Sequence, residues 1–426
     1  MLEIRKDPSA FPGIDAEALH RMMDEVSAFG GGPDGSMTRL TLSREDGLAR
    51  DWLAAWFAQE GLRLEIDAIG NMYGFLDWAG KDAPCIMCGS HLDSQPNGGR
   101  FDGAYGVIAA CSAIEAIRRR VAETGITPKC NFVIVNWTNE EGARFQPSLL
   151  GSSVNSGEID LDFALARRDG SGVSVAEALS EIGYAGEAAR VVPDALIEIH
   201  IEGSAHLEKA GLRIGAFTRF WGAVKYRLAY LGRQAHTGPT PMAERQDALL
   251  AAAYLIAELR DMADKAGPDL HTSAARLEVY PNSPNVVPGE TVMFIELRSG
   301  SAELLASAEA ELKEKIETCA ARANTSFEVR SIDRRRAGGF DAGLIDLAEQ
   351  TAKSLGQTVL RLDTIGGHDA VSMSAVTPAI VIGVPSVGGV IHHPTEFTTP
   401  EDRLLGTELL AGMLWRFCVD GNILKN

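Results

Sequence analysis

The stretches Ala83-Pro-Cys-Ile-Met-Cys-Gly-Ser-His91 and Asn131-Phe-Val-Ile-Val-Asn-Trp137 decide the fold class of this chain. Each is a short apolar run, which is typical of a strand buried on both faces of a sheet. Residues 107–121 between them have the pattern of a helix, and residues 196–201 form another apolar run. Strands that alternate with helices in this way predict an α/β domain, a mixed sheet with helices on both faces. Further helices are expected at 14–29, 43–61, 341–355 and 401–417, and a further strand at 379–383.

The hydrophobic pattern of the sequence changes near residue 214. Residues 224–230 alternate between apolar and mostly polar side chains, the pattern of a strand with one face in water. The segments 244–264, 275–280, 291–298, 301–322 and 326–332 then predict a helix, two strands, a helix and a strand. This β-α-β-β-α-β order is that of a ferredoxin-like unit. We therefore expect residues 214–330 to form a small inserted domain, and residues 1–213 and 331–426 to form the larger domain.

The composition restricts the partners and the compartment. The 426 residues include 40 Lys and Arg and 58 Asp and Glu, a formal net charge of −18. An acidic surface repels phosphate backbones, so we expect no nucleic-acid partner. The N-terminal residues contain no apolar secretory core, and no apolar run reaches the ~18 residues of a membrane span. We expect a soluble cytoplasmic protein, with buried free thiols at Cys85, Cys88, Cys111 and Cys418.

Polar residues with catalytic potential follow two predicted strands and an adjacent loop. Gly89-Ser-His-Leu-Asp93 places His91 and Asp93 at the carboxyl end of a strand, where open α/β sheets build their sites. Gly98-Gly-Arg-Phe-Asp-Gly-Ala-Tyr-Gly106 is a glycine-rich loop, which aims Asp102 and lets the backbone approach another group closely. Thr138-Asn-Glu-Glu-Gly142 brings two carboxylates, Glu140 and Glu141, to the same edge. Adjacent negative charges there are unfavourable unless a cation or a proton offsets them, although a solvated acidic loop is an equal alternative for this segment alone.

Histidines complete the set. His200 lies in an apolar strand, where a histidine is more often a core residue than a ligand, and residues 388–396 supply His392, His393 and Glu396. Each signal is weak alone. Together they supply imidazole and carboxylate groups, which suit Zn²⁺ or Mn²⁺.

In this order, the motifs resemble the M20 metallopeptidase clan. Within it they resemble the branch of N-carbamoyl-L-amino-acid hydrolases, β-ureidopropionase and allantoate amidohydrolase. The matching segments are Asn139-Glu-Glu-Gly-Ala-Arg-Phe145, Glu198-Ile-His-Ile-Glu202, Gly232-Arg-Gln-Ala-His-Thr-Gly-Pro-Thr-Pro-Met-Ala-Glu-Arg245, Asn285-Val-Val-Pro-Gly289, Gly367-His-Asp-Ala370 and His392-His-Pro-Thr-Glu396. Ordered matches over this span are specific, so the resemblance implies the fold and the metal chemistry of that clan.

The resemblance implies two divalent metal ions in each subunit. Asp102 would bridge the two ions, His91 and His200 would complete one site, and Glu141 and His392 the other. We expect Zn²⁺, with Mn²⁺, Co²⁺ or Ni²⁺ as alternatives. Each ion would then have three protein ligands and room for a shared water, as a catalytic site requires.

Five other residues receive roles from the resemblance. Asp93 would orient a metal-binding histidine, and Glu140 would act as the general base. His236, in the small lid or dimerisation domain, would stabilise the oxyanion, in the family often from the partner subunit. Asn285 and Arg298 would bind the carboxylate of the substrate. Arg298 also shares a strand face with Glu296, so it could simply pair with that residue.

The implied function is hydrolysis of a C–N bond in an N-carbamoyl amino acid or a related N-substituted acid, by a homodimer. The chain departs from the branch at Gly203-Ser204, where Gln-Gly is usual, at Thr364-Ile-Gly-Gly367, where Ser-Gly-Ala-Gly is usual, and at Ile391, where Ser is usual. A lost Gln amide removes a hydrogen-bond partner for the substrate. An N-acyl amino-acid deacylase or dipeptidase with the same metals is therefore the alternative. A metal-free binding homologue ranks lower, because all five ligands and Glu140 are present.

Overall fold

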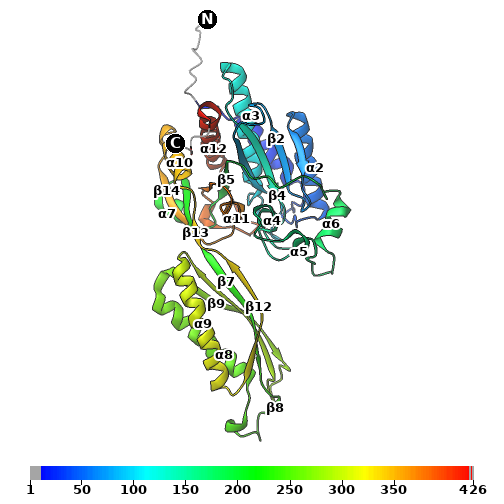
Figure 1. The fold of residues 1–426 in the computed structure, drawn as a ribbon, viewed down its shortest axis with the longest axis vertical. Coiled ribbons are helices and arrows are strands. Elements are labelled where there is room, and N and C mark those ends of the chain that lie inside the picture. Colours follow the sequence, from blue (N-terminus) through cyan, green and yellow to red (C-terminus); the bar gives the residue numbers. More distant parts are fainter. Residues whose placement is uncertain (1–10, 422–423, 425–426) are drawn as a thin grey trace. The chain divides into compact units, whose positions relative to one another are not determined.

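The computed structural model describes residues 11–421 and 424 of the chain, which divides into two compact units. Of these residues, unit 1 contains 11–218, Phe340–Leu362, 367–421 and 424, and unit 2 contains Arg219–Gly339 and Asp363–Gly366 (Figure 1). Within the described ranges, every helix is too short or too polar to cross a membrane.

Unit 1 is a layered α/β structure. Its helices are α1 (Ala16–Ser27), α2 (Arg44–Gln59), α3 (Ala104–Thr124), α4 (Leu150–Ser156), α5 (Leu161–Leu165), α6 (Val175–Ile182), α7 (His206–Ala210), α10 (Ala342–Ser354), α11 (Asp369–Met373), the short 3₁₀ turn η3 (Val387–Gly389) and α12 (Pro400–Asp420). Its strands are β1 (Arg63–Ile66), β2 (Met72–Leu76), β3 (Cys85–His91), β4 (Asn131–Trp137), β5 (Ala195–Ile201) and β15 (Ala379–Val384), together with β6 (Ile214–Phe220) and β14 (Val359–Thr364), whose last residues belong to unit 2.

The sheet of unit 1 is mixed. Its strand order is β1-β2-β4-β3-β5-β15-β6, and β14 also pairs with β6. The four central strands β4, β3, β5 and β15 are parallel, whereas β1, β2 and β6 pair antiparallel. The register sets His91 opposite Trp137 and His200 opposite Gly383. The carboxyl ends of the parallel strands therefore meet at one edge, as the sequence predicted.

Helices cover both faces of this sheet. Successive side chains of β5 point to opposite faces. Ile199 packs on the side of α12, where Gly406 leaves room for its side chain. The neighbouring Glu198 accepts a hydrogen bond from the backbone N–H of Ala370 in α11. The two helices therefore lie on opposite faces, and the predicted mixed α/β fold is confirmed.

Unit 2 contains a four-stranded antiparallel sheet. Its elements are β7 (Gly222–Leu231), β8 (Ala235–His236), η1 (Met242–Glu244), α8 (Ala248–Ala266), η2 (Gly267–Asp269), β9 (Leu270–Tyr280), β10 (Val286–Val287), β11 (Glu290–Ser299), α9 (Ala302–Arg322), β12 (Ser326–Arg335) and β13 (Gly338–Gly339). The strand order is β12-β7-β11-β9, with β8 and β10 in a separate two-stranded sheet. Helices α8 and α9 connect the strands in the order β7-α8-β9-β11-α9-β12, which confirms the predicted ferredoxin-like β-α-β-β-α-β unit.

One face of this second sheet is covered and the other is largely polar. The covered face buries Leu228 of β7 and Met293 of β11 against α8 and α9, whose buried side chains include Leu312. On the other face, Lys225 and Glu296 form an ion pair at 3.5 Å.

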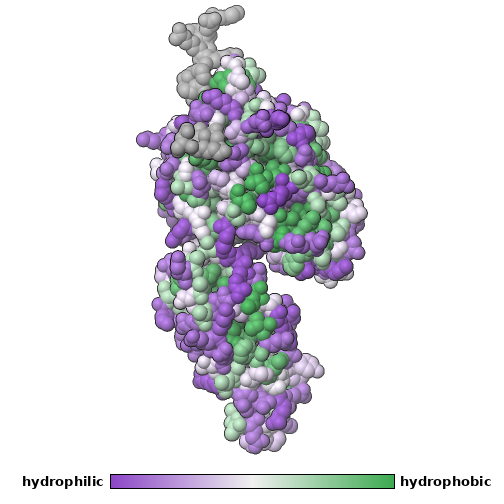
Figure 2. Space-filling model, viewed as in Figure 1, coloured by the Kyte–Doolittle hydropathy of each residue, from purple (hydrophilic) through white to green (hydrophobic). Residues whose placement is uncertain are grey.

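Figure 2 shows hydrophobic residues grouped on the visible surface of unit 2 near β12. The exposed apolar side chains of β12 are Phe327 and Val329, at 38% and 39% exposure, and both line a shallow cavity of about 200 Å³.

Candidate metal centre

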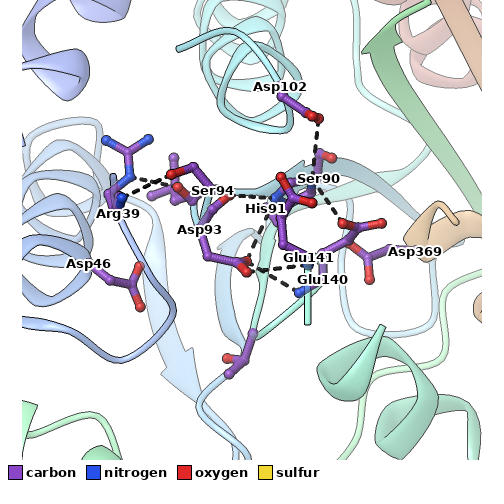
Figure 3. A network of polar contacts seen from close by, with 12 residues as sticks. Arg39, Asp46, Ser90, His91, Asp93, Ser94, Asp102, Glu140, Glu141 and Asp369 are labelled. Carbon is purple, nitrogen blue, oxygen red and sulfur yellow. Dashed lines mark hydrogen bonds and ion pairs between the residues drawn. The ribbon is translucent and has the colours of Figure 1, made fainter. Parts of the chain in front are cut away.

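The ends of three parallel strands bring the predicted ligands of unit 1 together. His91 is the last residue of β3, Glu141 follows β4 after a short turn, and His200 is the penultimate residue of β5. Asp102 immediately precedes the cap of α3, which is Gly103 with a φ of 65°. A Cβ at this glycine would lie 2.3 Å from the His91 ring, so the glycine-rich loop lets the ring reach the site. Figure 3 shows His91, Asp102 and Glu141 arriving from separate segments.

The first group of candidate ligands consists of His91, Asp102 and His200, all of them buried. Asp102 Oδ1 lies 3.0 Å from His200 Nε2 and 3.9 Å from His91 Nε2. Two ligands of one tetrahedral Zn²⁺ lie about 3.4 Å apart, because each is ~2.1 Å from the ion. The spacing of these three groups therefore suits a single cation.

The second group consists of Asp102, Glu141 and His392. Asp102 Oδ2 lies 3.1 Å from His392 Nε2, which lies 3.3 Å from Glu141 Oε2. The two carboxylate oxygens of Asp102 thus face different groups. The adjacent His393 is exposed, and its Nδ1 is 2.8 Å from the Thr395 hydroxyl oxygen.

Hydrogen bonds at Nδ1 of two imidazole rings favour metal binding through Nε2. Nδ1 of His91 is 2.9 Å from the backbone oxygen of Asp93, and Nδ1 of His200 is 2.9 Å from that of Ile201. An Nδ1–H that donates to a carbonyl leaves the Nε2 lone pair for a metal. Moreover, Nε2 of His91 is buried and makes no hydrogen bond within the described part of the chain. The donor set therefore fits divalent cations.

The electrostatics of the site also favour bound cations. Burial alone would raise the pKa of Asp102, but the hydrogen bond with His200 and the close contact of His392 hold it well below its usual range. Burial opposes protonation of His200, yet its contacts with Asp102 and the charge of Glu198 raise its pKa to about 9. The close contacts of His392 with the carboxylates of Asp102 and Glu141 raise its pKa to about 10. These carboxylates therefore need nearby positive charge, which metal ions would supply in place of protons.

Asp93 holds the glutamate loop in place. Its side chain is 2% exposed, and its two carboxylate oxygens accept hydrogen bonds from the backbone N–H groups of Glu140 and Glu141, each at 3.3 Å (Figure 3). Its Oδ1 is 3.6 Å from His91 Nδ1, farther than its own backbone oxygen. The His91 ring is therefore oriented by the backbone of Asp93, and the carboxylate fixes the loop that follows β4.

Glu140 is close to the first group. It is 8% exposed, and its Oε2 is 3.5 Å from His91 Nε2. Burial raises the pKa of Glu140 well above its usual value, and the charges of Asp369 and Glu141 add to the effect. A buried carboxylate with a raised pKa has the proton affinity that a general base needs.

The predicted residues of unit 2 fall into two places within that unit. His236 in β8 pairs with Val286 in β10, next to Asn285, whose backbone oxygen accepts a hydrogen bond from Thr237. Arg298 lies at the far end of β11, about 26 Å along the strand from its first residue. Its guanidinium donates to the backbone oxygen of Ile365 at 2.7 Å and pairs with Glu296 at 2.9 Å. The structure thus brings His236 and Asn285 together and leaves Arg298 apart from them.

Sequence reasoning missed a third group of possible ligands, Glu198, His200 and His368. Glu198 and His200 are two residues apart in β5 and share a face of the sheet, a spacing that could have revealed them. The two oxygens of Glu198 already accept hydrogen bonds from the Ser90 hydroxyl and the Ala370 backbone, each at 2.8 Å. This carboxylate therefore supports the His200 region rather than standing open to an ion.

Comparisons with known proteins agree with this geometry. A model of peptidase family M20/M25/M40 matches residues 87–416. A relative from Mycolicibacterium smegmatis is 43% identical over 417 residues, 96% of this chain and 94% of the relative. The N-carbamoyl-L-amino-acid amidohydrolase of Rhizobium meliloti is 33% identical over 400 residues, 93% of this chain and 95% of the relative. The crystal structure of an amidase of the hydantoinase/carbamoylase family from Burkholderia multivorans has a TM-score of 0.83 at 31% identity, covering 96% of this chain and 99% of that chain.

Proposed function

Because the chain belongs to peptidase family M20/M25/M40, we propose that it is a dinuclear metal-dependent amidohydrolase. Its relatives make it a hydrolase of amide bonds, the class that the sequence predicted. The proposed substrate is an N-carbamoyl amino acid or a related N-substituted acid. The observation that carries the dinuclear proposal is Asp102, with one carboxylate oxygen towards His200 and the other towards His392. A carboxylate whose two oxygens each face a different group of candidate ligands suits a bridging role.

The residues of unit 1 suit hydrolysis. When bound, two divalent cations lower the pKa of water and polarise the scissile carbonyl. Glu140 takes a proton from the attacking water as the C–O bond forms, and passes it to the leaving nitrogen when the C–N bond of the tetrahedral intermediate breaks. Asp93 keeps Glu140 in place through the backbone of its loop.

His236, Asn285 and Arg298 keep their proposed roles in binding the substrate. The ring of His236 is exposed, and its Nδ1 accepts a hydrogen bond from the backbone N–H of Gly238 at 3.0 Å. The proton of the neutral ring therefore sits on Nε2. An Nε2–H group of this kind is a suitable donor for the oxyanion of a tetrahedral intermediate.

One observation favours the alternative, an N-acyl amino-acid deacylase or dipeptidase with the same metals. A Cβ built on Gly203 would meet two side-chain carbons of Ile391, each at 3.5 Å. Two of the departures from the branch pattern are therefore neighbours in space, and they replace polar side chains by none and by an apolar one. Positions 203 and 391 therefore offer no side-chain hydrogen bond to a ureido group.

The experiment is an assay of the protein loaded with Zn²⁺, Mn²⁺ or Co²⁺ on matched substrates of one amino acid. N-carbamoyl, N-acetyl and dipeptide forms are compared by kcat/KM. We expect the N-carbamoyl form to be preferred. A clear preference for the acetyl form would support the alternative, and no hydrolysis of any form by fully loaded protein would refute the proposal.

We also propose a homodimer formed through unit 2. The apolar side chains Phe327 and Val329 on β12 support this, because they lie side by side at the edge strand of the sheet, and exposed apolar patches often mark protein–protein contacts. Light scattering coupled to size-exclusion chromatography should give twice the mass of one chain. Phe327→Glu should shift the protein towards the monomer, whereas a monomeric wild-type protein would contradict the proposal.

A further inference from the structure

Glu396 is a buried carboxylate that the proposed mechanism does not use. It lies in the loop between η3 and α12, and it is 5% exposed. A carboxylate is unfavourable in such a place unless hydrogen bonds replace its water. The partners of Glu396 are therefore informative about its role.

Backbone N–H groups from two distant segments meet this side chain. Its Oε1 accepts hydrogen bonds from Phe101 at 2.9 Å and from Asp102 at 3.1 Å. Its Oε2 accepts one from His392 at 3.3 Å. The carboxylate thus connects the glycine-rich loop before α3 to the loop after η3, and each loop supplies a candidate ligand of the second metal ion.

Gly99 makes room for this connection. A Cβ built on Gly99 would lie 2.1 Å from Glu396 Cδ and 2.2 Å from its Oε1. Any side chain at this position would displace the carboxylate. The glycine-rich loop therefore has a second purpose besides the room that Gly103 leaves for the His91 ring.

The backbone of His392 needs support. Its φ of 58° lies in the left-handed region, which is disfavoured for residues other than glycine. The same residue is half-exposed, with 47% of its side chain accessible, so packing restrains it only weakly. Its backbone N–H is therefore well placed for a restraint, and Glu396 provides one.

We propose that Glu396 is a positioning residue for the second metal ion, the one that Asp102, Glu141 and His392 would hold. It is not among the candidate ligands of the described residues. It fixes the backbones of two of the three ligands, and so sets the distance between them. This inference rests on the proposed dinuclear function. The ligands His91 and His200 are held by β3 and β5, so the first ion does not depend on Glu396 to the same degree.

The test is a calorimetric titration of metal-free, full-length protein with Zn²⁺. The wild-type protein should bind two ions. In Glu396→Gln, we expect the first affinity to stay within about twofold and the second to fall about 10–100-fold. Gly99→Ala should reproduce this pattern, because it disturbs the same contact from the other side. Glu401→Gln, an exposed glutamate five residues further on, is the matched control and should bind as the wild type does.

The outcomes separate this inference from the function beneath it. Thermal unfolding of the metal-free variants shows whether each is folded, and Gly99→Ala is the second measure if Glu396→Gln is not. If the wild type binds two ions and neither folded variant weakens the second, the positioning role is wrong while the dinuclear proposal stands. Equal weakening of both ions would also overturn it, because that indicates a general structural role. A wild type that binds fewer than two ions would overturn both.

Discussion

The two units place their polar side chains in different ways. In unit 1 the central strands are parallel and buried on both faces, so polar groups concentrate where β3, β4 and β5 end. These groups are buried and tied to backbone atoms, as His91 is to the Asp93 carbonyl. In unit 2 the antiparallel sheet leaves one face in water, and its polar groups lie along whole strands, including the exposed His236 at the end of the short strand β8. Rigid, buried groups suit bond-breaking chemistry, whereas exposed groups on a separate unit suit binding.

This comparison predicts that the largest loss of activity comes from unit 1. Glu140→Gln removes the proposed base, and we expect kcat to fall about 10²–10⁴-fold. Metal content, measured by mass spectrometry of the elements, should not change, because Glu140 belongs to neither group of ligands. Glu187→Gln, an exposed glutamate of the same unit, is the control. Normal turnover in Glu140→Gln would remove Glu140 from the mechanism.

In unit 2, His236→Ala should have the next largest effect. Loss of one oxyanion donor lowers kcat about 10²–10³-fold. Both metal ions should remain bound, since His236 is not among the candidate ligands. The control is His271→Ala, another exposed histidine of unit 2. Loss of metal in His236→Ala would show that this histidine belongs to the metal centre instead.

The buried charges of unit 1 predict a pH dependence of its stability. In the metal-free protein, the pKa of His200 is raised to about 9 and that of His392 to about 10, above the ordinary 6.5. Their protonated rings therefore stabilise the fold fully below pH 6.5, and this contribution is lost as the pH rises through about 9 and 10. For the fully buried His200 it is on the order of 3 kcal/mol.

Thermal unfolding between about pH 6.5 and 10, with and without bound Zn²⁺, checks this prediction. The melting temperature of the metal-free protein should fall across the range. The loaded protein should be much less sensitive, because metal ions bind neutral histidine and replace the protons. A metal-free protein that becomes more stable as the pH rises would contradict the assigned contacts of these histidines.

Part of the site could be predicted from the sequence because its residues lie at strand ends. His91, Glu141 and His200 end or follow buried apolar runs, so their convergence follows from the geometry of a parallel sheet. His392 has a weaker signal, because it stands in a loop eight residues after β15; the sequence offered it together with His393, and only the resemblance chose between the two. The sequence also did not predict that the Asp93 carboxylate accepts hydrogen bonds from two backbone N–H groups, since a sequence does not show which loop folds back onto a side chain.

The fold was predicted best where side chains are buried on a regular period. Strand β4 has the bounds expected from its apolar run, Asn131–Trp137. Strand β9 begins at Leu270, five residues before the expected start, because it is the edge of its sheet and its polar face hides the pattern. The edge strand β1 was not foreseen at all. Edge strands bury less, so their sequences carry a weaker signal.

The smallest expected effect on activity is that of Arg298, and it distinguishes substrate binding from a structural role in unit 2. Its guanidinium already pairs with Glu296 and donates to Ile365, with 29% of the side chain exposed. If it also binds the substrate carboxylate, Arg298→Gln should raise KM about tenfold and leave kcat unchanged, because such binding is equal in the ground and transition states. Glu296→Gln, which breaks the pair but keeps the arginine, should not raise KM. This pair is only partly exposed, with 29% and 26% of the two side chains accessible, and it contributes on the order of 1 kcal/mol, so both variants should melt near the wild-type temperature. If instead neither variant changes KM and both lower the melting temperature equally, Arg298 serves the sheet of unit 2 and has no part in binding substrate.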